Sequence, residues 1–299
     1  MEQNTMVSTP RTLGASLRLV FAGYVIGAAN LIPGVSGGTM ALILGIYEQM
    51  LDAIRSVSDR AVVKALLHRD FRQVFALVPW QFLMALGVGA FLSVITLSRL
   101  IEWLLETYPR YIAGFFFGLV AASIWVVAKE VRRWGVLPGV GFVVGAVGAW
   151  LLMSITPATT PETPWLLFLS ALVAIGAMVL PGISGAFVLI VFGQYQYALS
   201  AVNNRDLFLI IVVLLGAGVG LITFARGLSW LFKKQHDLTL AVLAGLVLGS
   251  LRKLWPWHEL SADALSQINY LPTAWTAEAT LVVVMMVVGL ALVLALGRE

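Results

Sequence analysis

The amino-acid sequence predicts an all-α polytopic membrane protein made of two inverted repeats, each a broken helical hairpin followed by three transmembrane helices. The first observation behind this prediction is the composition, because the 299 residues are 60% hydrophobic and only 11% charged. Their mean hydropathy of +0.93 is far above that of soluble domains. The second observation is a motif that occurs twice inside long apolar runs, as PGVSGGT at 33–39 and as PGISGA at 181–186.

The two copies of the motif align over fifteen positions, 33–47 and 181–195, of which six are identical. Farther along, RLIEWL at 99–104 resembles RGLSWL at 226–231, and a Gly-x-x-x-Gly pair at 114–118 has a counterpart at 245–249. That glycine spacing is by itself typical of helix packing in membranes. The matches predict a first repeat over 1–155, a linker without Lys or Arg over 156–164, and a second repeat over 165–299.

The two hairpins are predicted from length and from proline. Residues 13–31 are apolar, the motif follows, and residues 40–51 are apolar again. A helix crosses the hydrocarbon core in about 20 residues, and this stretch is about twice as long. Proline interrupts it because proline lacks an N–H group and clashes with the preceding turn. We therefore predict a hairpin here, re-entrant or with two limbs, and a second one over 165–180 and 187–199.

The remaining apolar runs predict three crossings in each half. They are 74–104, 112–128 and 136–155 in the first half, and 207–232, 238–254 and 279–296 in the second. Three is an odd number, so the second half enters the membrane upside down. Residues 52–72 carry many charges with apolar residues at helical spacing, which fits either an amphipathic helix at the membrane surface or a solvated loop.

The basic residues predict the orientation of the chain. Most of them gather on one side of the predicted crossings, namely Arg11, residues 55–72, Lys129, Arg132, Arg133, Lys233, Lys234 and Arg298. Loops that are rich in Lys and Arg stay in the cytoplasm. The sequence therefore predicts a multi-pass protein of the cytoplasmic (inner) membrane whose N- and C-termini are both cytoplasmic.

The repeated motif has the residue types of an anion site. After each Pro-Gly break, a Ser stands where a helix N-cap is needed, and glycines allow another group to approach closely. The free N–H groups of a helix N-terminus attract anions. Paired broken helices in a membrane chain indicate a transporter's binding site with alternating access. The competing interpretation is that Pro and Gly only kink or pack the helices.

Two arginines and one acid complete the predicted site. Arg99 and Arg226 occupy equivalent positions within apolar runs, where an arginine is costly and its planar fork suits a phosphate. The alternative is that both side chains extend to the interface. Glu48 directly follows Tyr47 and is the candidate for proton coupling, although the second copy has Gln196 at that place.

Several other functions are disfavoured by the sequence. The chain has no Cys, and His68, His236 and His258 are far apart in polar segments, so we expect neither thiolate chemistry nor a metal site. Enzyme signatures are absent, and no His is available as a base in the apolar runs beside Ser36 or Ser184. The net charge of +4 indicates cytoplasmic loops rather than nucleic-acid binding. We therefore predict no enzyme activity and no cofactor.

The paired motifs resemble those of a known family. The sequence NLIPGVSGGT at 30–39 with GIYE at 45–48, together with PGISG at 181–185 and GQY at 193–195, is similar to the two signature motifs of the DUF368 membrane proteins. This resemblance implies a polyprenyl-phosphate (undecaprenyl-phosphate) translocase, which returns the lipid carrier of cell-wall and surface glycan synthesis to the cytoplasmic leaflet. The family often has Asp at the position of Asn30, so a titrating carboxylate is absent there.

The two lines of reasoning meet at a phosphate group. We expect the hairpin tips to hold the head group of a polyprenyl phosphate while its tail stays among the membrane lipids. The alternatives are a secondary transporter of a small soluble anion and a membrane lipid-phosphate enzyme. The predicted substrate-binding residues are Asn30, Pro33, Gly34, Ser36, Gly37, Gly38, Thr39, Tyr47, Pro181, Gly182, Ser184, Gly185, Tyr195, Arg99 and Arg226, with Glu48 for proton coupling.

Overall fold

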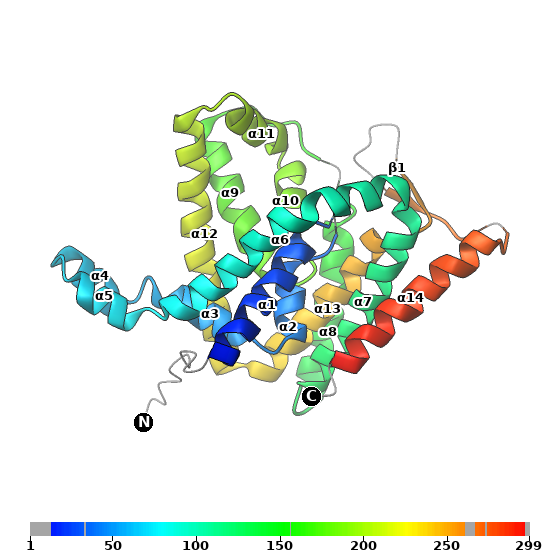
Figure 1. Cartoon of the computed structure of the whole chain (residues 1–299), viewed down its shortest axis with the longest axis horizontal. Helices are drawn as coiled ribbons and strands as arrows, with labels where there is room; N and C mark the ends of the chain where they lie inside the picture. The colour runs from blue at the N-terminus through cyan, green and yellow to red at the C-terminus, as the bar shows by residue number, and fades with distance from the viewer. Residues whose placement is uncertain (1–12, 33, 156, 261–266, 273, 297–299) are drawn as a thin grey trace.

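The structure, a computed structural model, describes residues 13–32, 34–155, 157–260, 267–272 and 274–296 (Figure 1). Almost all secondary structure in these residues is helical, which confirms the predicted all-α class. The described residues contain one short antiparallel sheet, in which Glu259 of β1 pairs with Ile268 of β2. Five described helices are long and apolar enough to cross a membrane, namely α1 (Leu13–Asn30), α6 (Trp80–Thr107), α7 (Pro109–Lys129), α12 (Leu207–Lys234) and α14 (Ala277–Leu296).

The described residues of the first half form eight helices. They are α1 (Leu13–Asn30), α2 (Gly37–Ile43), α3 (Tyr47–Ser56), α4 (Arg60–Leu67), α5 (Phe71–Leu77), α6 (Trp80–Thr107), α7 (Pro109–Lys129) and α8 (Val136–Leu152). The second half contains α9 (Pro164–Val179), α10 (Gly185–Val191), α11 (Tyr195–Asn203), α12 (Leu207–Lys234), α13 (His236–Ser250), the 3-10 turn η1 (Leu251–Leu254), β1 (His258–Leu260), β2 (Gln267–Asn269) and α14 (Ala277–Leu296).

The same series of elements occurs in both halves. A long helix is followed by a helix of 7 residues, a short helix and a helix of 28 residues, as α1, α2, α3 and α6 and again as α9, α10, α11 and α12. The packing is matched as well, because α1 lies against α6 as α9 lies against α12. In the other part of the molecule, α7 packs on α14 and α8 packs on α13, so each half supplies a partner to the other.

Glycines set the close approach of these two mixed pairs. A Cβ atom on Gly118 would overlap the backbone of Met286 in α14, and a Cβ atom on Gly245 would overlap the backbone of Phe142 in α8. Both glycines belong to the Gly-x-x-x-Gly pairs, which therefore serve helix packing, as their spacing indicates.

The limbs that follow the motifs are broken, whereas the sequence predicts each as one apolar run. The chain turns at Gly45 and at Gly193, which both have φ +67°, and the axes of α10 and α11 differ by 113°. Glycine populates this left-handed region freely, so a turn is permitted there despite the apolar flanks. The run at 74–104 is also not one helix, because α5 ends at Leu77 and α6 begins at Trp80.

Two segments distinguish the halves. Residues 57–79 separate α3 from α6 and include α4 and α5, whereas only residues 204–206 separate α11 from α12. In Figure 1, α4 and α5 lie to one side of the main bundle. In the second half, η1 and the β1–β2 hairpin follow α13, and Trp257 packs with Ala279 and Val282 of α14.

Candidate functional site

The two copies of the motif have nearly the same backbone. Gly34 and Gly182 have φ values of +85° and +83°, in the left-handed region that favours glycine. Ser36 and Ser184 then adopt extended conformations at the N-caps of α2 and α10, with φ values of −113° and −95°. Each motif thus breaks the chain and starts a short helix, as the sequence predicts.

The first motif satisfies its own N–H groups. The Gly37 N–H donates to the Asn30 side-chain oxygen over 2.9 Å, and the Gly38 N–H donates to the Ser36 hydroxyl over 3.2 Å. Ser36 and Thr39 are buried, with 2% and 0% exposure. The N-terminus of α2 is therefore already capped from within the protein.

The second motif leaves its first N–H groups available. The position that corresponds to Asn30 is occupied by Met178, which has no oxygen to accept them. Among the described residues no acceptor contacts the N–H groups of Gly185 and Ala186, and Ser184 makes no capping bond. The two copies share a backbone, but within the described part of the chain the second is the one whose first N–H groups lack an acceptor.

The tips of the two hairpins contact each other. The Gly182 N–H donates to the Thr39 hydroxyl over 3.1 Å, and the Tyr47 hydroxyl donates to the Val179 carbonyl over 2.8 Å. The Ser36 hydroxyl also reaches the Leu180 carbonyl at 3.4 Å. These bonds join α2 and α3 to the break between α9 and α10, so Thr39 and Tyr47 hold the hairpins together.

A cavity of about 210 Å³ lies between the two breaks. Four of the predicted residues line it, namely Asn30, Gly34, Gly182 and Ser184. The other lining residues are Leu31, Ile32, Met153, Ala186, Phe187, Ile190 and Lys253. Because the Asn30 oxygen accepts from Gly37, its NH2 group is left to donate elsewhere. Amide, hydroxyl and backbone donors thus meet in a mostly apolar cavity.

Lys253 is the basic residue of this cavity, and the sequence interpretation missed it. It belongs to η1, outside the candidate spans, and its ammonium group lies 4.0 Å from the centre of the Phe187 ring. Burial lowers the pKa of Lys253 below that of an ordinary lysine. No carboxylate within the described residues is at ion-pair distance from it. A partly buried cation without a carboxylate partner favours an anion beside it.

The two predicted arginines do not line the cavity. Arg226 lies half-exposed on α12, where it donates to the Ser58 carbonyl and stands 3.9 Å from the Asp59 carboxylate. Arg99 is exposed on α6. Their predicted role in neutralising a head group stays a prediction.

The other predicted residues take different positions. Gly37, Gly38, Pro181 and Gly185 belong to the two tips without lining the cavity. Tyr195 is 36% exposed at the start of α11, unlike its buried counterpart Tyr47. Pro33 lies outside the described residues.

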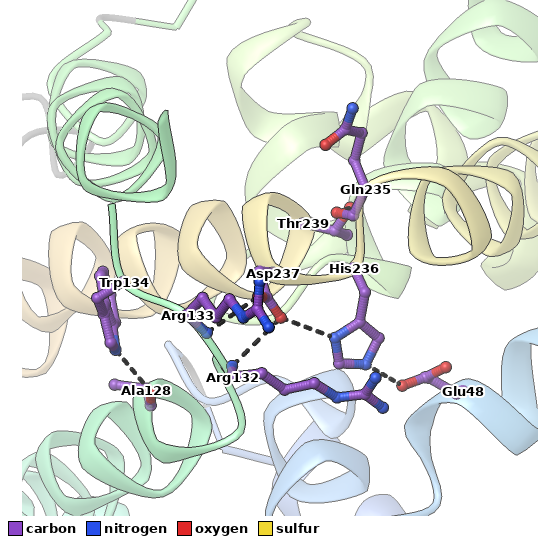
Figure 2. A network of polar contacts seen from close by, with 9 residues as sticks. All are labelled: Glu48, Ala128, Arg132, Arg133, Trp134, Gln235, His236, Asp237 and Thr239. Atoms are coloured by element: carbon purple, nitrogen blue, oxygen red, sulfur yellow. Dashed lines mark hydrogen bonds and ion pairs between the residues drawn. The ribbon is translucent and has the colours of Figure 1, made fainter. Parts of the chain in front are cut away.

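Glu48 belongs to a polar network away from the cavity (Figure 2). Its carboxylate lies 3.1 Å from the His236 Nε2 atom, and the His236 Nδ1 atom lies 3.3 Å from Asp237. The Asp237 carboxylate accepts the backbone N–H groups of Arg132 and Arg133 at 3.2 and 3.0 Å. The network therefore joins α3 to the start of α13 and to the segment between α7 and α8.

A second contact lies beside this network. The Asp52 carboxylate of α3 accepts the Ser229 hydroxyl over 2.5 Å and pairs with the Lys233 ammonium at 3.3 Å. Both partners belong to α12, so the hairpin of the first half is fastened to the long helix of the second half. The described residues contain no group of three or more His, Cys, Asp or Glu side chains that could hold a metal ion.

Membrane-length helices, and broken hairpins that meet at a cavity lined by hydrogen-bond donors, are the architecture of a multi-pass membrane transport protein. Comparison with known sequences gives the family. The model of the VCA0040-like family, described as undecaprenyl phosphate translocase-like, matches residues 26–270, and the chain belongs to this family. The match confirms the family resemblance that the paired motifs indicate.

Two curated relatives have the same description. The polyprenyl-phosphate transporter of Vibrio cholerae serotype O1 is 39% identical over 237 residues, which cover 79% of this chain and 77% of that protein. The polyprenyl-phosphate transporter of Staphylococcus aureus is 27% identical over 255 residues, which cover 79% of this chain and 85% of that protein. No solved structure matches the chain.

Proposed function

We propose that this protein moves polyprenyl phosphate, such as the undecaprenyl-phosphate lipid carrier, across the cytoplasmic membrane for reuse in cell-envelope glycan synthesis. One observation carries the proposal: Lys253, a partly buried cation with no carboxylate partner in the described residues, lines a cavity between the two broken hairpins. The names of the two relatives support the same substrate.

In this proposal the phosphate lies in the cavity and the prenyl tail stays in the lipid. The Lys253 ammonium supplies the positive charge, and the Asn30 amide, the Ser184 hydroxyl and the free N–H groups of α10 donate to the phosphate oxygens. The tail does not fit, because about 210 Å³ is smaller than the pockets of roughly 300–1,000 Å³ that hold drug-sized ligands. A lateral opening toward the bilayer is therefore part of the proposal.

The proposed cycle is alternating access between two inverted repeats, and the matched packing of α1 on α6 and α9 on α12 supports it. The cavity includes Met153, at the end of α8 opposite the basic segment 129–133. With that segment and both termini in the cytoplasm, the cavity belongs to the outer side. Inward opening then requires the contacts of Asp52 with Ser229 and Lys233 to break. A proton on Glu48 would weaken its contact with His236 and couple this step to the proton gradient.

A binding measurement tests the substrate. The purified protein in detergent is offered a polyprenyl phosphate, the corresponding polyprenol and inorganic phosphate. We expect selective binding of the phosphorylated lipid. Preference for inorganic phosphate would instead favour transport of a small soluble anion. Binding of the polyprenol with the same affinity as the polyprenyl phosphate would show that the site does not recognise the phosphate group.

Variants of Lys253 test its role in binding. Lys253→Met removes the charge and keeps most of the side-chain volume, and we expect it to weaken binding by about 10- to 100-fold, as for a lost charge-assisted hydrogen bond. Lys234→Met is the matched control, because Lys234 also lies over an aromatic ring, that of Trp230 at 5.0 Å, but does not line the cavity. Equal affinities of the two variants would refute the proposed site.

A further inference from the structure

The helices α4 and α5, here called the arm, have no counterpart between α11 and α12. The arm has a small core of its own, in which Val62 and Ala65 of α4 pack against Val74 and Val78. In Figure 1 it lies apart from the main bundle, with α3 between them. The arm therefore packs mainly on itself.

A second set of apolar side chains on the arm faces outward. Leu67 is 79% exposed, Phe75 68% and Phe71 60%. Phe71 and Phe75 are one turn apart on α5 and so share one face. Side chains of this size are costly to leave in water, at roughly 25 cal/mol for each Å² of apolar surface. The exposed face therefore calls for an apolar environment that the protein itself does not provide.

Basic residues surround these apolar side chains. Arg60, Lys64, Arg69 and Arg72 are all exposed. The one acid within the arm, Asp70, is used locally, because its carboxylate accepts the Gln73 N–H over 3.0 Å and caps α5. The outward charge of the arm is therefore positive, and it is interleaved with the apolar side chains.

The chain holds the arm beside the bilayer. Helix α5 ends at Leu77 and the membrane-length helix α6 begins at Trp80. At the other end of the arm, Arg226 of α12 donates to the Ser58 carbonyl and lies near Asp59. The arm is thus attached to two membrane-length helices, and its position follows that of α12.

We propose that the arm is a docking surface for anionic phospholipid head groups in the leaflet where α6 begins. Its apolar side chains insert beneath the head groups, and its four basic residues contact the lipid phosphates. The combination of exposed Leu and Phe with Lys and Arg is the chemistry of helices that lie in the membrane interface. A soluble protein partner would not account for the attachment of the arm directly to a membrane-spanning helix.

The absence of native cysteine allows a direct test in the full-length protein. Leu67→Cys and, separately, Gln73→Cys are labelled with an environment-sensitive fluorophore and placed in nanodiscs of phosphatidylcholine with or without phosphatidylglycerol. Gln73 is the matched control, because it is exposed on the same arm but polar. We expect the label at 67 to be protected from an aqueous quencher when phosphatidylglycerol is present, while the label at 73 stays accessible. Equal quenching of both labels in those discs would overturn the proposal.

The charges are tested in the Leu67→Cys background. We expect Lys64→Glu combined with Arg72→Glu to lower the ratio of quencher-protected to quencher-accessible label by at least about tenfold. The reason is that each basic residue near an anionic membrane surface contributes to the attraction between the arm and the lipid. Lys234→Glu makes the same charge reversal outside the arm and should leave the protection of the label unchanged. Protection that persists in the double variant would show that charge does not select the lipid. Polyprenyl-phosphate binding, measured in parallel, shows that the variants are folded and separates this result from the transport proposal.

Discussion

The bond between the hairpin tips gives a quantitative prediction. Replacing Thr39 by Val removes the hydroxyl that accepts the Gly182 N–H at 3.1 Å, while the shape of the side chain is kept. Thr39 is fully buried and Gly182 is buried, so the substitution leaves the Gly182 N–H without its partner in the protein. A buried donor left without a partner costs about 1–3 kcal/mol. We expect Thr39→Val to destabilise the protein by about 2 kcal/mol, or roughly 4–8 °C in melting temperature.

The assay is thermal unfolding in detergent followed by the fluorescence of the ten tryptophans. Thr163→Val is the matched control, because the Thr163 hydroxyl is buried without any hydrogen-bond partner and does not cap α9. Removing that hydroxyl relieves an unsatisfied group, so the control should be neutral or slightly stabilising. Thr39→Ser keeps the acceptor and should lose less stability than Thr39→Val.

The comparison can refute the reasoning cleanly. If Thr39→Val melts at the same temperature as Thr163→Val, the hydrogen bond between the tips does not contribute to stability. If Thr39→Ser is as unstable as Thr39→Val, the lost methyl contacts rather than the hydroxyl determine the effect.

Three further predictions concern the turns, the proton and the charge in the cavity. Gly45→Ala should cost about 1–2 kcal/mol for its left-handed φ, whereas Gly193→Ala should cost more, because only Gly193 lies against a neighbouring backbone; equal melting temperatures would contradict this. Glu48→Gln should abolish the acceleration of transport that a pH gradient causes in vesicles, while transport without a gradient is retained. If the variant still responded to the gradient, Glu48 would not be the residue that couples transport to protons. Between pH 7.5 and 9.5 a phosphate monoester stays a dianion, because its second pKa is about 6. Binding should therefore weaken over this range as Lys253, whose pKa is lowered by burial, loses its proton. Lys253→Arg should bind without this pH dependence, and the same pH dependence of binding in both proteins would show that Lys253 does not cause it.

The breaks in the chain could be predicted from the sequence because their causes are local. A Pro-Gly pair in an apolar run interrupts a helix whatever the rest of the fold does. Gly34 and Gly182 accordingly adopt matching left-handed conformations. The turn at Gly45 was missed, although its counterpart at Gly193 repeats it, because one glycine in an apolar run is also compatible with a continuous helix.

The contents of the cavity depend on tertiary contacts and could be predicted only in part. Lys253 lies 71 positions after Gly182, at the end of the predicted crossing 238–254, and only the fold brings it to Phe187. The opposite holds for Arg226, whose apolar flanks suggest a membrane site although its partners are Ser58 and Asp59 at the base of the arm. The position of a charged residue relative to an apolar run therefore predicts poorly whether the residue lines the cavity.

The difference between the two motifs follows from a single position. Asn30 accepts the first N–H of α2, whereas Met178 has no side-chain oxygen, and the corresponding N–H of α10 has no acceptor among the described residues. An aspartate at position 30 would accept the same N–H but would also place a negative charge in the cavity that Lys253 lines. That charge would compete with a bound phosphate until it was protonated or displaced. The amide at position 30 keeps the cap without this competition, and Asn30→Asp should therefore weaken phosphate binding more at high pH than at low pH.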